Sequence, residues 1–383
     1  LKEVGIGNVL VAESTPHCVE QLVLNPEAML VVDWDAGMKD VTQVLEAAKG
    51  HFHVDTRPIF LLSPEVDDTV VSTATEYHVS RVHSGEVSRV IIEEHLRALI
   101  AEETTLDGTR ADLVKVADAR KRGDLTMAGH LLRDLRIKYA TDRRISCELA
   151  DNLISEDRWD EAFEILQGLA RVDDSNLRVK HLLARCHMKR GEFDQATGVL
   201  QQCELMNPYN VERLLDLGDS LLQQARTSEA MEKYQKAASL DKGNARAQRG
   251  EGKCMLVEGN LNEALVLLRE VSGSRELASV FNDAAILSIR QNRFEDGVNL
   301  YQTGIELPEL GNRLVARLLF NLGLAQYKFE HFEEALRCFE SALQKDPTFA
   351  NAEHNAKALA ARYGDAGRST PAPAAGARED AFS

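Results

Sequence analysis

The sequence predicts a multidomain protein, with a doubly wound α/β domain at the front followed by an all-α superhelical solenoid. Two patterns carry this prediction. Short apolar runs alternate with helical segments over residues 8–104, and a small residue recurs at nearly constant spacing through the rest of the chain. The chain has 383 residues, more than one compact domain usually contains, so two or more structural units are expected.

Composition restricts the class of protein further. Hydrophobic residues make up 44% and charged residues 28% of the chain, which is typical of a globular protein. Apolar runs such as AMLVV and IFLL are far shorter than the ~20 residues of a membrane helix, and no signal segment opens the chain, so we expect a cytoplasmic protein that makes no membrane contact. Six cysteines without a CxxC pair indicate reduced, packed thiols rather than disulfides or zinc ligands.

Negative charge is concentrated at the front of the chain. The first 104 residues contain 18 acidic and 7 basic side chains, a net charge of −11 within the total of −16. This balance argues against a general nucleic-acid binder. The aromatic content of 5% also argues against single-strand binding, because such proteins stack bases on aromatic side chains. We therefore do not expect nucleic acid as a partner.

A sequence repeat with a nearly constant period fills the second part of the chain. Its small residues are Ala128, Ala162, Ala196, Ala230, Ala264, Gly297 and Ala335. The first five are evenly spaced, the next step is one residue shorter, and the last step is longer. A helix-period segment precedes each small residue and a second one follows, so each repeat predicts two antiparallel helices that bury their faces by stacking on neighbouring repeats. The small residue is expected where helices cross most closely.

With this spacing, the segments LLDLGDSLLQQ…EAMEKYQKAASLD and LFNLGLAQYKFEHFEEALRCFESALQKDP resemble the tetratricopeptide repeat family. The resemblance covers roughly residues 109–363. It implies seven repeats over residues 105–347 and a capping helix over residues 348–363. Residues 364–383 have the composition of a disordered tail. Two irregular junctions, VSGSRE and PELGNR, are expected to bend or hinge the superhelix.

In the family that this chain resembles, the first helix of each pair lines a concave surface, here called the inner face. The resemblance places thirteen basic residues there and only three acidic ones, Asp151, Glu212 and Asp219. The basic residues are Arg110, Arg120, Lys121, Arg144, Arg178, Arg185, Lys189, Arg246, Arg249, Lys253, Arg290, Arg317 and Lys328.

A concave surface lined by one sign of charge attracts an oppositely charged ligand, so we expect a protein or peptide partner with an acidic segment. The family resemblance further implies that Asn282 and Asn321 fix a peptide backbone or a terminal carboxylate. The alternative is that the charged stripe is simply a solvated helix face.

At the front, the apolar runs NVLVAES, AMLVVD, RPIFLLS and HVSRVHS are separated by helical segments, which predicts parallel strands buried on both faces. Reactive groups in such sheets lie at the carboxyl ends of strands, where Asp33 stands.

Here the opening LKEVGIGNVLVAES…MLVVDWD and the spacing from Asp33 to Ser63 resemble the receiver domain of response regulators, over residues 1–104. The resemblance implies that Asp33 is a phosphoacceptor and that Ser63 is the switch hydroxyl. It also implies Mg²⁺ as a cofactor if the domain is active, with Asp33 as one metal ligand and the other ligands, together with the first strand, ahead of Leu1. The segment RVHSG places His83 or Ser84 where the family has a lysine, and His83 is the possible substitute.

Together these features favour a bacterial two-component signalling adaptor, in which the receiver-like domain regulates protein binding by the repeats and a histidine kinase is an expected partner. The alternative is a scaffold for an envelope, motility or secretion assembly, with an unphosphorylated receiver as a docking surface. The sequence contains no glycine-rich phosphate loop, nucleophile elbow or HExxH motif, so we do not expect an enzyme.

Overall fold

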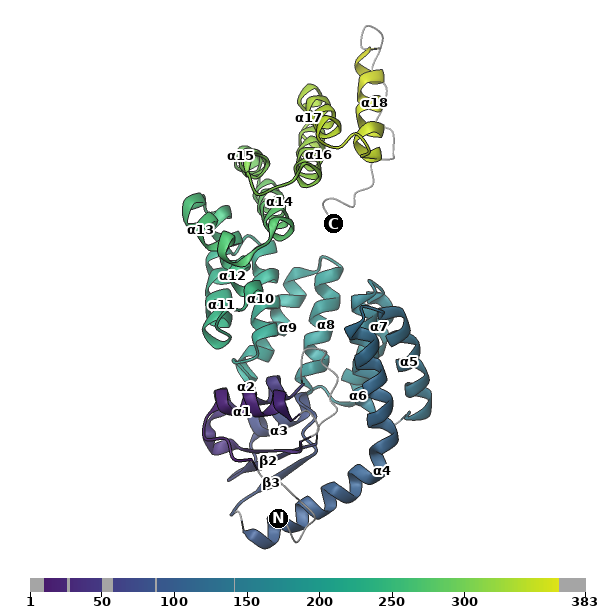
Figure 1. The fold of residues 1–383 in the computed structure, drawn as a ribbon, viewed down its shortest axis with the longest axis vertical. Coiled ribbons are helices and arrows are strands. Elements are labelled where there is room, and N and C mark those ends of the chain that lie inside the picture. The colour runs from purple at the N-terminus through teal and green to yellow at the C-terminus, as the bar shows by residue number, and fades with distance from the viewer. Residues whose placement is uncertain (1–9, 26–27, 50–57, 87, 141, 365–383) are drawn as a thin grey trace. The chain divides into compact units, whose positions relative to one another are not determined.

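The computed structural model describes residues 10–25, 28–49, 58–86, 88–140 and 142–364 (Figure 1). The tail predicted for residues 364–383 lies outside this part of the chain except for Gly364, which ends the last helix. The chain divides into two compact units, Leu1–Leu217 and Gly218–Ser383.

A three-stranded parallel sheet forms the front of the first unit, in the order β1-β2-β3. Its strands are β1 (Leu30–Asp33), β2 (Ile59–Ser63) and β3 (Arg81–Ser84). The helices between and before them are α1 (Thr15–Leu24), α2 (Met38–Lys49) and α3 (Asp68–Glu76), with a short 3-10 turn, η2 (Trp34–Ala36), after β1. The strand and helix alternation predicted from the sequence is thus confirmed from residue 15 onward.

Side chains alternate across the central strand, so both faces of the sheet are covered. Ile59 and Leu61 on β2 pack with buried residues of α1, α2 and α3. Phe60 points to the other face and packs with Leu96 of α4 (Arg89–Lys121), which begins beneath the sheet in Figure 1. This continuous burial explains why β2 reads as an unbroken apolar run rather than an alternating one.

Two expectations for the front of the chain need correction. The run NVLVAES was expected to be a strand, but its described residues, 10–14, form none. Leu10 and Val11 are 57% and 73% exposed, so the described part of the sheet does not cover these two side chains. The boundary predicted at residues 104/105 falls inside α4, which runs unbroken for 33 residues because the segment contains no proline.

In the described part of the chain, seven helical pairs follow one another, and the first of them begins with the second half of α4. The helices after α4 are α5 (Leu125–Lys138), α6 (Arg143–Ser155), α7 (Trp159–Val172), α8 (Leu177–Lys189), α9 (Phe193–Met206), α10 (Val211–Gln223), α11 (Thr227–Leu240), α12 (Ala245–Val257), α13 (Leu261–Val271), α14 (Ser274–Arg290), α15 (Phe294–Glu306), α16 (Asn312–Lys328), α17 (Phe332–Lys345) and α18 (Ala350–Gly364). The last of these coincides with the expected capping helix.

The turn within each pair contains one residue in the left-handed region, which reverses the chain in a few residues. This residue is glycine in three turns, including Gly123 with φ of 75°, and a residue other than glycine in four, including Ala225 with φ of 63°.

The recurring small residues lie where the helices cross. All six alanines of the repeat pattern are completely buried. Glycines play the same part around Tyr234, whose ring is fully buried between α10 and α12. A Cβ atom at Gly218 would lie 2.8 Å from this ring and one at Gly250 only 2.4 Å from it. The close spacing of these helices therefore requires glycine at both positions.

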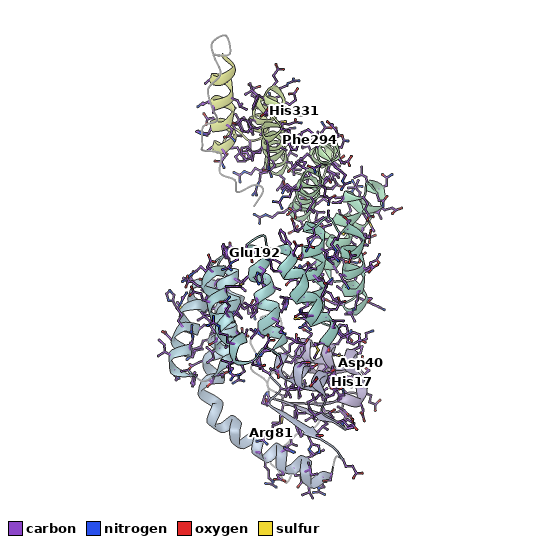
Figure 2. All side chains as sticks on the ribbon, turned by 180° about the vertical axis from the view of Figure 1, so that it is seen from behind. His17, Asp40, Arg81, Glu192, Phe294 and His331 are labelled. Carbon is purple, nitrogen blue, oxygen red and sulfur yellow. The ribbon has the colours of Figure 1, made fainter. Side chains whose placement is uncertain are left out.

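Ring contacts join the turns of neighbouring repeats in the second unit. The ring of Phe294, the first residue of α15, lies 4.3 Å from that of Phe329 and meets His331 edge-on at 5.3 Å (Figure 2). In the first unit, the guanidinium of Arg190 lies 4.0 Å above the ring of Phe163, from the preceding pair. Each turn is thus held by the repeat next to it, as expected for stacked repeats.

The irregular junctions VSGSRE and PELGNR precede the two longest helices of the second unit. Both α14 and α16 have 17 residues, whereas α10 and α12 have 13. The predicted bend at these junctions stays a prediction.

All six cysteines are free, as the sequence predicted. Burial raises the pKa of the Cys254 thiol to about 12 and that of the Cys147 thiol to about 11, so both thiols stay protonated and weakly reactive. In the described part of the chain, no helix is both long and apolar enough to cross a membrane.

Replacing Gly250 by alanine should destabilise the second unit by roughly 1–3 kcal/mol, because the added Cβ would overlap a ring that has no space to move into. Alanine at Gly168 in α7 is the matched control. Nothing lies within 4 Å of a Cβ there, so this change should instead stabilise by about 0.5–1 kcal/mol. Urea unfolding followed by circular dichroism would measure both, and equal effects would contradict the close packing around Tyr234.

Candidate functional site

The carboxyl ends of β1 and β2 place two of the predicted site residues on neighbouring strands. Asp33 lies opposite Leu62 in the parallel register, one residue before Ser63. The Asp33 side chain is exposed, and its Oδ1 accepts a hydrogen bond from the backbone N–H of Asp35 at 3.0 Å. The Ser63 hydroxyl is buried and donates to the Glu65 carbonyl at 2.5 Å. Both polar groups are therefore engaged locally, and the phosphoacceptor role stays a prediction.

His83 lies on β3, next to Leu62 of β2 in the register. Its Nε2 is 3.3 Å from the Glu86 carbonyl oxygen, and its ring lies 5.2 Å from that of His95. Within the described residues, no three His, Cys, Asp or Glu side chains come together as a metal site. The described residues around Asp33 therefore do not by themselves form the predicted Mg²⁺ site.

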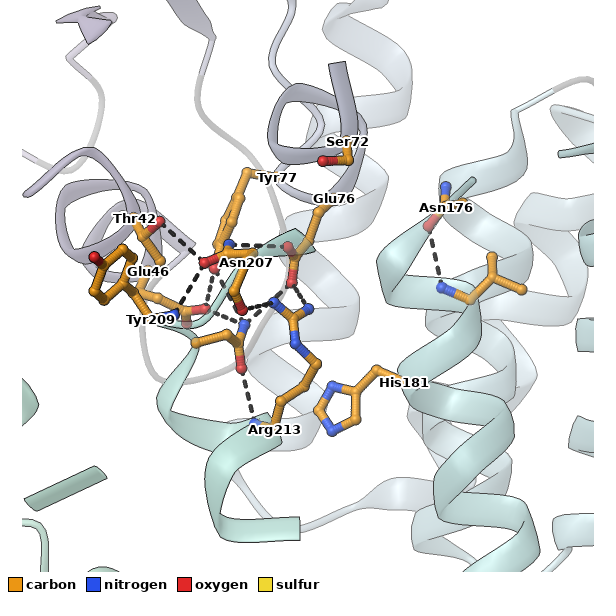
Figure 3. A network of polar contacts seen from close by, with 12 residues as sticks. Thr42, Glu46, Ser72, Glu76, Tyr77, Asn176, His181, Asn207, Tyr209 and Arg213 are labelled. Carbon is orange, nitrogen blue, oxygen red and sulfur yellow. Dashed lines mark hydrogen bonds and ion pairs between the residues drawn. The ribbon is translucent and has the colours of Figure 1, made fainter. Parts of the chain in front are cut away.

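A buried ion pair joins the α/β layer to the repeats within the first unit. Figure 3 shows Glu76, at the end of α3, and Arg213, in the first turn of α10, pointing toward one another. They form a salt bridge with side chains only 3% and 2% exposed. A second guanidinium nitrogen of Arg213 donates to the Asn207 carbonyl at 3.2 Å. The carboxylate of Glu76 holds the pKa of Arg213 above its usual value even though burial acts in the opposite direction.

Two asparagines complete this network around Glu76 (Figure 3). The side-chain amide of Asn207 donates to Glu76 at 3.3 Å, and that of Asn210 donates to Glu76 at 3.1 Å and to Glu46 of α2 at 2.7 Å. The hydroxyl of Tyr77 also donates to Glu46, at 2.5 Å. Burial, reinforced by the two carboxylates, raises the pKa of Tyr77 well above its ordinary value, so the phenol stays a neutral donor.

Asn210 has a second role in its own helix, because its Oδ1 accepts the backbone N–H of Arg213 at 2.9 Å. The residue that caps the start of α10 thus also contacts the α/β layer. Sequence analysis missed this contact. The only local signal is the segment NPYNVER, which places two asparagines and an arginine around a helix start.

On the inner face of the first unit, basic side chains are matched by acids from neighbouring helices. Glu148 of α6, with its side chain 4% exposed, forms salt bridges with both Arg120 of α4 and Arg178 of α8. Arg185 of α8 pairs with Asp151 of α6 at 2.6 Å. Residues predicted to face a ligand therefore hold adjacent helices together.

The same pattern continues toward α10. The His181 imidazole lies 2.7 Å from Asp216, which is also 4.0 Å from Arg185. Lys189 pairs with Asp157 in the turn before α7 at 2.8 Å. The side chain of Arg110, another predicted inner-face residue, lies outside the described part. The basic surplus expected from the sequence is thus largely neutralised in this unit.

The second unit begins with the same type of pairing. Arg246 of α12 lies 2.6 Å from Asp219 of α10, and Lys253 of α12 lies 3.1 Å from Asp283 of α14. Burial alone would lower the pKa of Lys253, but these two carboxylates raise it, so the ammonium stays charged. Arg290, at the end of α14, donates to the side-chain oxygen of Gln223 at 2.9 Å.

The pairing stops between α14 and α16. Arg317 has the same position relative to its repeat's small residue as Arg246 has, but Ile286 occupies the position that corresponds to Asp219. Among the described residues, neither Arg317 nor Arg275 of α14 forms an ion pair, and Arg249 of α12 reaches only the Val271 carbonyl, at 3.5 Å.

Asn282 and Asn321 are brought together, as the sequence suggested, but they bind each other. The Asn321 amide donates to the Asn282 side-chain oxygen at 2.7 Å, and the hydroxyl of Tyr301 donates to the same oxygen at 3.2 Å. This amide contact replaces the ion pair that joins the earlier helices. Both asparagines line a cleft.

Two clefts flank α14. The larger cleft, about 420 Å³, lies between α14 and α16, and the smaller, about 190 Å³, lies between α12 and α14. The residues that line the larger cleft are Arg275, Glu276, Ala278, Ser279, Asn282, Leu314, Arg317, Leu318 and Asn321. The smaller cleft is lined by Asp219, Arg246, Arg249, Gly250, Lys253, Glu276, Ser279, Val280 and Asp283.

The inner-face prediction is therefore resolved into two parts. The residues that line the clefts are Arg246, Arg249, Lys253, Asn282, Arg317 and Asn321. The residues that contact other parts of the array instead are Arg178, Arg185, Lys189 and Arg290. Lys328 is exposed at the end of α16 and lines neither cleft. Sequence analysis missed Arg275 and the acids Glu148, Asp216 and Asp283. Position in the repeat alone does not distinguish a side chain that faces a neighbouring repeat from one that faces a ligand.

Family models described as tetratricopeptide repeat match residues 153–217, 221–276 and 316–349. These segments are tetratricopeptide repeats, so the predicted repeat type is confirmed there, and the predicted seven repeats over residues 105–347 stay a prediction. The matches lie outside the front hundred residues, and the receiver and two-component interpretations gain no support from them. No curated protein sequence matches the chain.

Several solved structures resemble the chain. A tetratricopeptide repeat protein from Parabacteroides merdae is 17% identical with a TM-score of 0.43, over 65% of this chain and 97% of that one. YrrB, described as a TPR protein with an unusual peptide-binding site, is 17% identical with a TM-score of 0.31, over 59% and 97%. MamA from Desulfovibrio magneticus RS-1 is 14% identical with a TM-score of 0.36, over 42% and 92%. At these TM-scores, the identification of the repeats rests on the family models.

Replacing Glu76 by alanine should destabilise the first unit by about 3–5 kcal/mol, because Arg213 would keep a buried charge without its partner. The double replacement Glu76→Ala with Arg213→Met should lower the free energy of unfolding by less than the sum of the two single changes, and a double-mutant cycle would measure this difference. Glu93→Ala is the control, since Glu93 pairs with the exposed Arg89 and its replacement should leave the stability nearly unchanged. Additive effects in urea unfolding would show that the pair does not join the two layers.

Proposed function

We propose that the chain is a protein-interaction scaffold in which the second unit holds a peptide segment of a partner protein on its inner face. One observation carries this proposal. Arg249, Arg275 and Arg317 form no ion pair with the described residues, and all three line the clefts beside α14. Most other inner-face cations are already paired with acids of the chain. An acidic ligand therefore gains the most binding free energy in these two clefts.

The lining of the larger cleft supports a peptide rather than a simple ion. Leu314 and Leu318 supply apolar surface, while Ser279 and Asn321 supply polar groups beside the two arginines. Ligand sites in proteins commonly combine apolar walls with a few polar groups that fix orientation. The volume of about 420 Å³ is also within the range of such sites.

The α/β layer fits a fixed docking surface better than a detachable regulator. Separating it from the repeats of the first unit would expose or leave unpaired the charges of Glu76 and Arg213, which are almost completely buried. Breaking a buried pair in this way is costly. The scaffold alternative is therefore favoured over the signalling adaptor.

A phosphoacceptor role for Asp33 is a second proposal. It is supported by the exposed carboxylate at the carboxyl end of a parallel strand, which is where such sheets present reactive groups. In this role Asp33 would be the nucleophile, and the buried Ser63 hydroxyl would have to leave the Glu65 carbonyl to reach a phosphoryl group.

A displayed library of random peptides, panned against the full chain, should enrich sequences with net negative charge. Arg317→Glu should abolish the enrichment, because it reverses the charge of the larger cleft. Arg337→Glu is the matched control, since Arg337 is exposed on α17 and, among the described residues, its ion pairs are with Glu333 and Glu334 of the same helix. Enrichment that does not differ between these variants would contradict peptide binding on the inner face.

Incubation of the chain with acetyl phosphate and Mg²⁺ should add the mass of one phosphoryl group to the wild type and none to Asp33→Asn. Intact-mass spectrometry would detect the adduct, and hydroxylamine should remove it because acyl phosphates are labile to this nucleophile. A wild-type chain that keeps its original mass would leave the scaffold function in place and show that this chain by itself is not phosphorylated at Asp33.

A further inference from the structure

We infer that the two clefts beside α14 bind one ligand together, a peptide in which two acidic side chains stand three residues apart. The peptide crosses α14 in the polyproline II conformation, with one acidic side chain in each cleft. The inference rests on the proposed function, because it specifies the ligand of the same surface.

The two clefts adjoin on a single helix. Glu276 and Ser279 of α14 line both of them, one cleft opening toward α12 and the other toward α16. Packed helices have axes ~8–10 Å apart. Groups bound on either side of α14 are therefore separated by about one helix spacing.

Each cleft contains a cation that the array leaves unbalanced. In the smaller cleft, Arg246 and Lys253 are paired with Asp219 and Asp283, which leaves Arg249, whose contact at 3.5 Å is with an uncharged carbonyl. In the larger cleft, Arg275 and Arg317 form no ion pair with the described residues. Because Glu276 lines both clefts, the two together contain five cations and three acids, so two positive charges are in excess. One carboxylate per cleft would balance both, and guanidinium groups bind carboxylates through two parallel hydrogen bonds.

The distance between the clefts selects the backbone conformation of the ligand. In polyproline II, residues three apart lie on the same side and ~9 Å apart, because the helix has three residues per turn and rises ~3.1 Å per residue. In a β-strand, residues on the same side are ~6.6 or ~13 Å apart, which is shorter or longer than a helix spacing. Two acidic residues separated by two others, in the polyproline II conformation, therefore match the distance between the two clefts.

The surface between the clefts constrains the two intervening residues. The Glu276 carboxylate lies under them and repels a third acidic side chain, whereas the exposed Ser279 hydroxyl is available to the peptide backbone. Leu314 and Leu318, at the wall of the larger cleft, favour an apolar residue next to the acid bound there. The expected ligand has two acids, an uncharged or basic middle and an apolar flank.

Fluorescein-labelled peptides of proline and alanine test this spacing with the full-length chain. Each contains two glutamates at sequence separations of two, three, four or five, and one contains a single glutamate. Fluorescence anisotropy should give a Kd for the separation of three about tenfold below the others, equivalent to about 1.4 kcal/mol. The same Kd at every separation, or no binding of any of these peptides, would overturn the inference.

A charge exchange identifies which cleft holds each acid. Arg317→Glu should lower the affinity for the best double-glutamate peptide to that of the single-glutamate peptide. Replacing one of the two glutamates of this peptide by lysine should restore binding to the Arg317→Glu variant only. Arg337→Glu should leave every Kd unchanged. If library peptides without paired acids bind and depend on Arg317, the scaffold function stands and the acid pairing is wrong. If neither library nor designed peptides bind, both proposals fall.

Discussion

Charge pairing between neighbouring helices organises the inner face of this protein. Glu148 joins α4 to α8 through two arginines, Asp219 joins α10 to α12, and Asp283 joins α14 to α12. Each pair removes a cation from the surface that a ligand could reach and fixes the spacing of two repeats. Arg317 has Ile286 at the position that corresponds to Asp219, and it forms no ion pair with the described residues. The candidate site is thus located by the cations that this pairing leaves out, and the net charge of the stripe would not have located it.

The network around Glu76 has a different consequence. It joins α2 and the end of α3 to the start of α10 through charged and amide groups, among which Glu76 and Arg213 are almost completely out of solvent. Such a contact favours one arrangement of the layer and the first repeats, because any displacement leaves buried polar groups without partners. The strand end that contains Asp33 is therefore held on a rigid support within the first unit, whatever its chemistry.

The repeat architecture was predictable from the sequence because it depends on local regularities. A buried alanine that returns at a constant interval reports a helix crossing, and Gly218 reports the close approach of Tyr234. The three strands were predictable for the same reason. The residues that face a ligand could not be predicted in this way. Arg178 and Arg246 have the same place in their repeats as Arg317, and only the acids of the neighbouring helix decide which of these arginines is paired. The contact between Glu76 and Arg213, far apart in the chain, also left no periodic signal.

The central claim is that the cation-bearing clefts beside α14 are the binding site for an acidic peptide. The most direct test places a photo-reactive amino acid at Ser279, which lines both clefts, and irradiates the full chain with the double-glutamate peptide of separation three. The same label at Val266 of α13, 64% exposed and in neither cleft, serves as the comparison. We predict a covalent adduct at Ser279 that disappears with excess unlabelled peptide, and none at Val266. Equal adducts at both positions would contradict the claim.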